Sequence, residues 1–338
     1  MVTGMTFRLQ HRVYRLAFRT PVRTAHGVWS EREGLLLRVE DGNGRVGYGE
    51  VAPLPWFGTE TLEQAVELCG SLGGQLAGDT LTRIEPRFRC VRFALASALD
   101  PVSEKTWAQQ KLAVAALLPA GRLALEKTDA ALESGWLAFK WKVGVEDPAD
   151  ELAILDDLLG RLPKYARLRL DANGGWNTRQ AARWLERCAE RPVEFIEQPV
   201  APDQVDALLG LAQDYPVTLA LDEAVAGPED LRRWHGLGWP GVYVIKPATA
   251  GAPEELLATL TELKADAVFS SALETPVGRL AALRTAFSYQ GPQTRALGFG
   301  VGALFADETC NGPGIGPLIE TASLAGVEAE KLWNSLPT

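Results

Sequence analysis

Short apolar runs alternate with amphipathic segments between about residue 111 and residue 302, and this repeat constrains the fold more than any other sequence feature. The runs expected to form strands are Leu112–Leu118, Ala138–Lys142, Arg167–Asp171, Val193–Glu197, Thr218–Asp222, Val242–Lys246, Ala267–Ser270 and Arg295–Phe299. Helices are expected between them, for example over Pro148–Leu162, Thr178–Ala189 and Pro253–Leu263. A period of about 25 residues is typical of parallel βαβ units, and a series this long favours a closed α/β barrel. An open doubly wound sheet is the alternative.

The segments on either side of the repeat have a different character. A turn over Asp41–Gly44 separates the strand-like runs Gly34–Glu40 and Arg45–Glu50, which is typical of a hairpin. The apolar spacing over Thr61–Leu72 predicts a helix. We therefore expect a small α+β domain over residues 1–105, the barrel over 106–302, and a C-terminal segment over 303–338 that packs back on the first domain.

The composition narrows the class of protein. Of the 338 residues, 46% are hydrophobic and 23% are charged, which is ordinary for a folded protein. The net charge of −9 argues against nucleic acid as a partner, because phosphate binding requires clustered Lys and Arg. No apolar run reaches the roughly 18 residues of a membrane helix, and no signal peptide is evident. We expect a cytoplasmic protein with reduced cysteines that acts on a small molecule; a homo-oligomer is left open.

Acidic residues end three consecutive predicted strands. Asp171, Glu197 and Asp222 hold these positions at intervals of about 25 residues. Because the C-terminal ends of barrel strands converge on one face, their carboxylates are expected to lie side by side. Neighbouring carboxylates repel one another unless a cation lies between them. Oxygen ligands favour Mg²⁺, so we expect Mg²⁺ here, with Mn²⁺ as a substitute.

Lysines are expected on both sides of this acidic group. Lys140 and Lys142 are two residues apart on a strand and therefore face the same side. Lys246 ends a strand on the opposite wall. Such lysines can flank one substrate carbon, while a metal that holds the substrate carboxylate stabilises the enediolate left when the α-proton is removed. Each residue alone is more often a helix cap or an ion-pair partner, so the inference depends on the whole set.

Several motifs together resemble those of one family: Lys140-Trp141-Lys142, Asp171-Ala172-Asn173, Glu197-Gln198-Pro199, Asp222-Glu223 and Val244-Ile245-Lys246-Pro247. They are similar to the motifs of the muconate-lactonising-enzyme subgroup of the enolase superfamily, and the resemblance covers nearly the whole chain. It implies a (β/α)₇β barrel with an α+β capping domain built from the N-terminal segment and the C-terminal tail. It also implies that the three carboxylates are Mg²⁺ ligands, with Lys142 as the base on one face and Lys246 on the other.

Two further segments resemble the o-succinylbenzoate synthases of this subgroup, Gly49–Thr61 and Phe269–Gly278. That family dehydrates 2-succinyl-6-hydroxy-2,4-cyclohexadiene-1-carboxylate to 2-succinylbenzoate in menaquinone or phylloquinone synthesis. The resemblance implies that Lys142 removes the α-proton and then protonates the leaving hydroxyl. Lys246 would be a cation–π partner of the ring, and Lys140 would help to hold the carboxylate. The expected substrate-binding residues are Asn173, Ser270, Ser271, Pro55 and Phe57.

Other interpretations stay open at this point. Ser270 and Ser271 are equally compatible with capping the next helix. The predicted last strand ends in Ala296–Gly302, without the Thr found in many relatives and without the aspartates of dipeptide epimerases. N-succinylamino acid racemases share almost every residue named above, and muconate cycloisomerase is a third member of the subgroup. A Schiff-base aldolase would not need the carboxylates, and a non-catalytic scaffold would usually have lost one of them.

Overall fold

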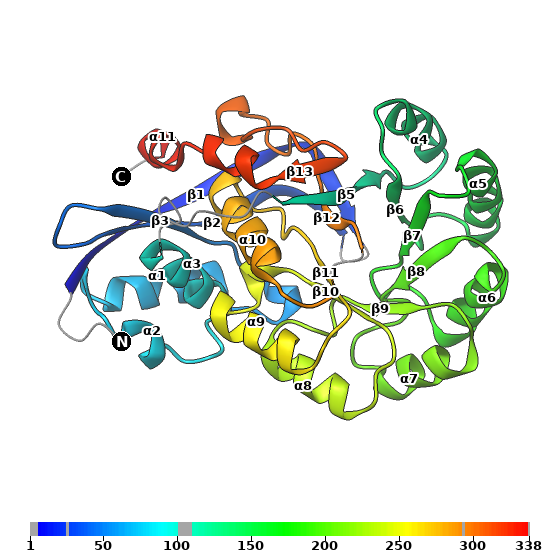
Figure 1. The fold of residues 1–338 in the computed structure, drawn as a ribbon, viewed down its shortest axis with the longest axis horizontal. Coiled ribbons are helices and arrows are strands. Elements are labelled where there is room, and N and C mark those ends of the chain that lie inside the picture. The colour runs from blue at the N-terminus through cyan, green and yellow to red at the C-terminus, as the bar shows by residue number, and fades with distance from the viewer. Residues whose placement is uncertain (1–5, 25–26, 101–109, 293–294, 337–338) are drawn as a thin grey trace.

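The computed structural model describes residues 6–24, 27–100, 110–292 and 295–336. Within these ranges the chain forms an antiparallel sheet with its helices, a barrel beside it, and a C-terminal segment that touches both (Figure 1). The predicted boundary at residue 105 lies outside the described residues, and the domain limits remain a prediction. No helix of the described ranges is long and apolar enough to span a membrane.

The N-terminal sheet has the strand order β3-β2-β1-β4. Its strands are β1 (Thr6–Thr24), β2 (Gly27–Glu40), β3 (Val46–Val51) and β4 (Gln75–Ala77). The hairpin between β2 and β3 confirms the predicted turn, in which the Asp41 carboxylate accepts hydrogen bonds from the backbone N–H groups of Asn43 and Arg45. Strand β1 was not predicted, because charged and apolar residues alternate irregularly along it.

Helices cover one face of this sheet, and their apolar faces form its core. They are α1 (Leu62–Ser71), α2 (Thr80–Arg83) and α3 (Arg89–Leu99), and a short 3-10 turn, η1 (Pro55–Phe57), precedes them. The helix predicted over Thr61–Leu72 is confirmed as α1, with Thr61 and Gln64 forming a capping box at its start. Leu35, Leu37 and Val51 of the sheet pack against Val91 and Ala94 of α3.

The repeat predicted in the middle of the chain forms parallel strands. They are β5 (Lys111–Leu118), β6 (Ala138–Lys142), β7 (Arg167–Asp171), β8 (Val193–Glu197), β9 (Leu219–Leu221), β10 (Val242–Ile245), β11 (Ala267–Phe269) and β12 (Leu297–Gly300). Neighbours along the chain pair with one another, β12 pairs with β5, and a bridge between Ser270 and Gly298 joins β11 to β12. The described strands therefore close into a barrel, as predicted.

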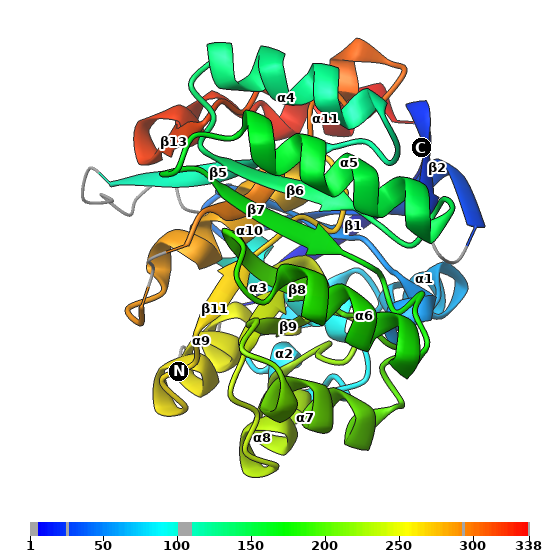
Figure 2. The same cartoon turned by 90° about the vertical axis from the view of Figure 1, so that its right-hand side faces the viewer.

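One helix follows each strand up to β11, and these helices surround the barrel (Figure 2). They are α4 (Leu123–Glu133), α5 (Pro148–Arg161), α6 (Thr178–Cys188), α7 (Val205–Asp214), α8 (Pro228–Gly236), α9 (Pro253–Glu262) and α10 (Pro276–Ser288). Trp141 of β6 points outward and packs against Trp184 of α6, with ring centroids 6.5 Å apart. Lys140 and Lys142, on either side of Trp141, consequently face the interior.

A cluster of charged side chains closes the barrel at the end opposite the acidic strand ends. The Glu194 carboxylate accepts hydrogen bonds from Arg169 Nε at 2.7 Å and from Arg295 Nη1 at 2.9 Å. Arg295 also pairs with Asp266, at 2.8 Å. Strand β12 begins two residues later than predicted, at Leu297.

The C-terminal segment contacts both parts of the molecule. Its strand β13 (Leu318–Glu320) pairs antiparallel with β5. Its last helix, α11 (Ala329–Ser335), places Leu332 and Trp333 in a cluster with Tyr14 and Phe18 of β1. Between β12 and α11 lie β13 and short 3-10 turns, as expected for a Gly-rich segment that becomes helical near its end.

Candidate active site

The acidic residues of three neighbouring strands meet at the C-terminal mouth of the barrel. Asp171 and Glu197 are register partners at the ends of β7 and β8, and Asp222 directly follows β9. Each of these side chains is buried. Their side chains come together as the spacing of the sequence predicted, because parallel strands of similar length end on the same face.

Ammonium groups lie between these carboxylates. Lys140 Nζ lies 2.9 Å from Asp171 Oδ2 and 2.6 Å from Glu197 Oε1, while Lys246 forms an ion pair with Asp222. In this arrangement, the described residues contain no group of three or more His, Cys, Asp or Glu side chains placed to hold a metal ion. Burial lowers the pKa of Lys140, but the charges of the three carboxylates outweigh it and raise this pKa overall. The neighbouring carboxylates therefore favour the protonated form of Lys140 in this structure.

Four carboxyl groups share this site with three lysines, and burial affects two of these carboxyl groups strongly. Burial and the charge of Asp171 raise the pKa of Glu197 well above its usual value. Burial and the charge of Asp222 raise the pKa of Glu223 to about 7. Oxygen-only donors that converge from three strands fit a hard divalent cation, so these residues suit Mg²⁺.

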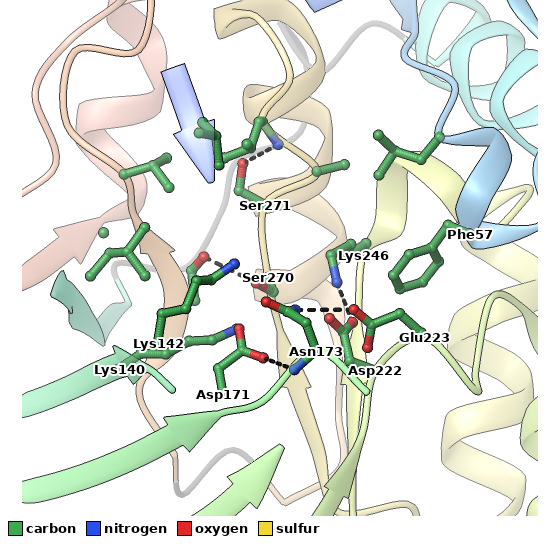
Figure 3. Close-up of a pocket in the computed structure, with 18 of the residues that line it drawn as sticks. Phe57, Lys140, Lys142, Asp171, Asn173, Asp222, Glu223, Lys246, Ser270 and Ser271 are labelled. Atoms are coloured by element: carbon green, nitrogen blue, oxygen red, sulfur yellow. Dashed lines mark hydrogen bonds and ion pairs between the residues drawn. The ribbon is translucent and has the colours of Figure 1, made fainter. Parts of the chain in front are cut away.

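The lysines border one pocket from different sides. Lys140 and Lys142 project from β6 at one side, and Lys246, which follows β10, projects from the other (Figure 3). Lys246 Nζ lies 4.3 Å from the ring centroid of Phe57, whose side chain is supplied by the N-terminal domain. Phe57 was predicted to bind substrate; its contact with Lys246 could not be predicted from the sequence.

Residues just after the strands hold the acidic site in place. Asn173 adopts a left-handed backbone, with φ of 44°, and its Nδ2 donates to Glu223 Oε1 at 3.0 Å. Gln198, with φ of 37°, accepts hydrogen bonds from the backbone N–H groups of Asp222 and Ala224. Asn173 lines the pocket, as does Glu223, which the sequence analysis did not select although it directly follows a predicted metal ligand.

Ser270 and Ser271 also line the pocket, but neither caps the helix that follows them. Ser270 Oγ donates to the Gly298 carbonyl at 3.2 Å, and Ser271 Oγ donates to the Glu274 carboxylate at 3.1 Å. Thr275 is the N-cap residue of α10 instead. The capping interpretation is therefore wrong for both serines, and their role as substrate-binding residues remains a proposal.

An apolar wall completes the pocket, and much of it comes from the N-terminal domain. This wall contains Val22, Trp29, Leu54, Trp56 and Phe57. The rings of Trp29 and Trp56 meet edge to face with centroids 5.1 Å apart. Pro55 begins the same turn but is exposed and does not line this pocket. On the barrel side Gly298 allows Ser270 to lie close to its backbone, because a Cβ atom there would lie 2.5 Å from Ser270 Oγ.

A buried carboxylate behind the serines makes the stability of the fold depend on pH. Burial raises the pKa of Glu274 from 4.5 to about 7, and the charge of Glu50 contributes. Because the pKa of Glu274 is higher in the folded than in the unfolded state, its protonated form contributes to the stability of the fold. This contribution is complete at low pH and is lost as pH rises through about 7.

We expect Glu274→Gln to remove this dependence. Between about pH 5 and pH 8 the wild type should lose roughly 3 kcal/mol of unfolding free energy relative to the variant. Denaturant titrations of both proteins across this range measure the difference. Parallel pH profiles would contradict the assignment of the raised pKa to Glu274.

Two family matches agree with this architecture. Residues 123–308 match the family described as "Enolase C-terminal domain-like", and residues 8–100 match the family described as "MenC, N-terminal domain". The first match covers most of the barrel and the second covers the N-terminal sheet with its helices. Fold and site together define a barrel enzyme of the enolase superfamily.

Individual relatives narrow this class. The chain is 42% identical over 299 residues to an o-succinylbenzoate synthase of Thermosynechococcus vestitus, covering 87% of this chain and 92% of that protein. A crystal structure of o-succinylbenzoate synthase from Thermosynechococcus elongatus BP-1, complexed with Mg in its active site, has a TM-score of 0.84 and 38% identity, covering 97% and 100% of the two chains. Muconate cycloisomerase 1 of Rhodococcus opacus is 29% identical over 311 residues, covering 82% and 83%. The chain belongs to the o-succinylbenzoate synthase family, which confirms the resemblance stated above.

Proposed function

We propose that the protein dehydrates 2-succinyl-6-hydroxy-2,4-cyclohexadiene-1-carboxylate to 2-succinylbenzoate, a step of menaquinone or phylloquinone synthesis. The observation that carries this proposal is the 42% identity with an o-succinylbenzoate synthase over 87% of the chain. The placement of Lys142 and Lys246 at different sides of one pocket, next to the acidic strand ends, supports it. We further propose a cytoplasmic location and a small-molecule carboxylate as the substrate.

Asp171, Glu197 and Asp222 are the residues proposed to hold Mg²⁺, for which Mn²⁺ would substitute. When bound, the cation would neutralise the negative charge that develops on the substrate carboxylate as the α-proton leaves. Lys140, which contacts two of these carboxylates, would add a fixed positive charge beside the same substrate group.

Lys142 is proposed to transfer the proton in both halves of the reaction. As a neutral amine it takes the α-proton and becomes an ammonium group. The same group then donates this proton to the hydroxyl, which leaves as water from the same face while the ring becomes aromatic. Lys142 is neutral again at the end, so the reaction needs no further proton donor.

Lys246 is proposed to face the ring from the other side as a cation–π partner. Phe57 contacts the ammonium group of Lys246 and would hold it over the place proposed for the substrate ring. Asn173, Ser270 and Ser271 line the same pocket and remain our candidates for contacts with the rest of the substrate. Pro55 would contribute only by shaping the turn that carries Phe57.

We expect Phe57→Leu to lower kcat/KM for dehydration by roughly tenfold, because a cation–π contact is worth about 1 to 2 kcal/mol when it is shielded from water. Phe57→Tyr keeps an aromatic ring over Lys246 and should stay within about threefold of the wild type. Steady-state kinetics on the three proteins measure the effect. Equal losses in both variants would show that the exact shape of the side chain, and not its aromatic contact with Lys246, matters.

Incubation of the purified protein with the cyclohexadiene acid and Mg²⁺ tests the proposed reaction. We expect loss of the diene ultraviolet absorbance, formation of 2-succinylbenzoate by mass spectrometry, and no turnover after EDTA treatment. Absence of product in a sample that binds Mg²⁺ would overturn the proposed reaction.

Racemisation of N-succinylamino acids is a second candidate activity, favoured by one observation. Lysines at different sides of a pocket can remove a proton from one face of a carbon and return one to the other face, as a racemase requires.

A further inference from the structure

Glu50 carries its carboxylate from the N-terminal domain into the barrel. It lies near the end of β3, and its side chain is fully buried. Glu50 Oε1 accepts hydrogen bonds from Tyr14 Oη at 2.5 Å and from the backbone N–H of Thr275 at 2.9 Å. Glu50 Oε2 accepts from the backbone N–H of Gly278 at 2.9 Å and from the Thr275 hydroxyl.

These contacts place an acidic group of one domain at the start of a helix of the other. Thr275 is the N-cap of α10, and Gly278 lies in its first turn. The first turn of α10 contains no acidic residue of its own. Because a helix N-terminus has unpaired N–H groups and a partial positive charge, a carboxylate stabilises it. Glu50 fills this role, so the backbone N–H groups of Thr275 and Gly278 already have a carboxylate partner.

Gly278 allows this close approach. A Cβ atom at this position would lie 2.7 Å from Glu50 Oε2 and 3.0 Å from Glu274 Cβ. Any larger residue would therefore push the carboxylate away from the helix. The position is helical with a negative φ, so the glycine serves the approach of Glu50 and not an unusual backbone conformation.

The segment between β11 and α10 forms one wall of the pocket. Ser270–Leu273 all line it. At one end Ser270 is bonded to Gly298, and at the other end the start of α10 is bonded to Glu50. Between these ends Leu273 has a left-handed backbone with φ of 59°, and its N–H donates to Ser271 Oγ at 2.9 Å. The Glu274 carboxylate also accepts hydrogen bonds from Ser271 Oγ at 3.1 Å and from the Ala272 N–H at 2.5 Å. Because Glu274 directly precedes Thr275, a change at the start of α10 is passed on to this segment.

We propose that Glu50 is a positioning residue that holds the Ser270–Leu273 wall in its substrate-binding shape. It does so across the interface between the two domains, so recognition by this wall depends on their docking. The catalytic lysines lie on other strands, β6 and the end of β10, and do not contact Glu50. Disturbing Glu50 should therefore weaken substrate binding more than proton transfer. The kinetic part of the inference rests on the proposed dehydration.

Glu50→Gln replaces one acceptor oxygen with a donor that faces other donors, and Gly278→Ala pushes the carboxylate away. We expect KM to rise roughly tenfold in both variants, because leaving a buried polar group unpaired weakens binding by about tenfold or more. The reduction in kcat should be less than about threefold. Amide hydrogen exchange in residues 271–278 should become faster in both. Alanine is otherwise favourable inside a helix, so Gly278→Ala provides a test if Glu50→Gln does not fold.

Glu194→Gln is the matched control, because it removes a largely buried, paired carboxylate at the opposite end of the barrel. It should lower the melting temperature while KM and exchange in residues 271–278 stay at wild-type values. An unchanged KM and unchanged exchange in both test variants would overturn the proposal. If the wild type does not dehydrate the cyclohexadiene acid, the proposed function fails, but the exchange experiment still tests the positioning role.

Discussion

Lys142→Ala should lower kcat for dehydration by about 10⁴-fold, the upper end of what a positioned proton-transfer group contributes. The reason is that we assign Lys142 to both proton transfers, removal of the α-proton and protonation of the leaving hydroxyl. Lys140 does not take over this role in our account, because its ammonium group is paired with Asp171 and Glu197. Single-turnover measurements with the cyclohexadiene acid give the chemical step directly.

A measurement of Mg²⁺ binding distinguishes a variant that has lost only the proposed base, Lys142, from one whose metal site is disrupted. Lys142 makes no ion pair with the three carboxylates, so calorimetric Mg²⁺ affinity should be retained in Lys142→Ala. Lys127→Ala, at an exposed position of α4, is the control and should behave like the wild type. Near-normal turnover in Lys142→Ala would remove this residue from its proposed role.

Glu197→Gln should weaken Mg²⁺ binding by roughly 10²-fold or more, a larger effect than loss of a residue that only supports a ligand. Glu197 is buried and bonded to Lys140, so the substitution replaces one of three proposed carboxylate ligands with a neutral amide without changing the side-chain shape. The Mg²⁺ concentration for half-maximal activity measures the change, and added Mg²⁺ should restore part of the rate.

Glu194→Gln, three residues earlier on the same strand, is the control for this experiment. Its carboxylate binds Arg169 and Arg295 at the other end of the barrel. The variant should unfold more easily but keep the Mg²⁺ dependence of the wild type. If Glu197→Gln also keeps that dependence, Glu197 is not a ligand.

The barrel and the convergence of its acidic residues could be predicted because both follow from local patterns. Asp171, Glu197 and Asp222 end apolar runs at regular intervals, and parallel packing brings strand ends together whatever the loops do. The N-cap of α10 could also have been predicted from the sequence, because Thr275 directly precedes Pro276, and proline is a common first residue of helices. Ser270 and Ser271 were considered as caps of this helix instead, because serine is a common cap residue.

Other features depend on partners that are distant in the sequence. Glu50 contacts Thr275 across 225 residues, and Lys246 meets the ring of Phe57 from another domain. Strand β1 is recognisable only through its pairing with β2 and β4, since its own pattern is irregular. Tertiary contacts of this kind decide burial and pairing, and local propensity carries no information about them.

The most direct test of the account compares both candidate substrates in one preparation. Initial rates would be measured for the cyclohexadiene acid and for N-succinylamino acids, with Mg²⁺ and after its removal. We predict Mg²⁺-dependent dehydration with a far higher kcat/KM than any racemisation. Racemisation without dehydration would contradict the proposed reaction and leave the barrel, the acidic site and the lysines with the second candidate activity.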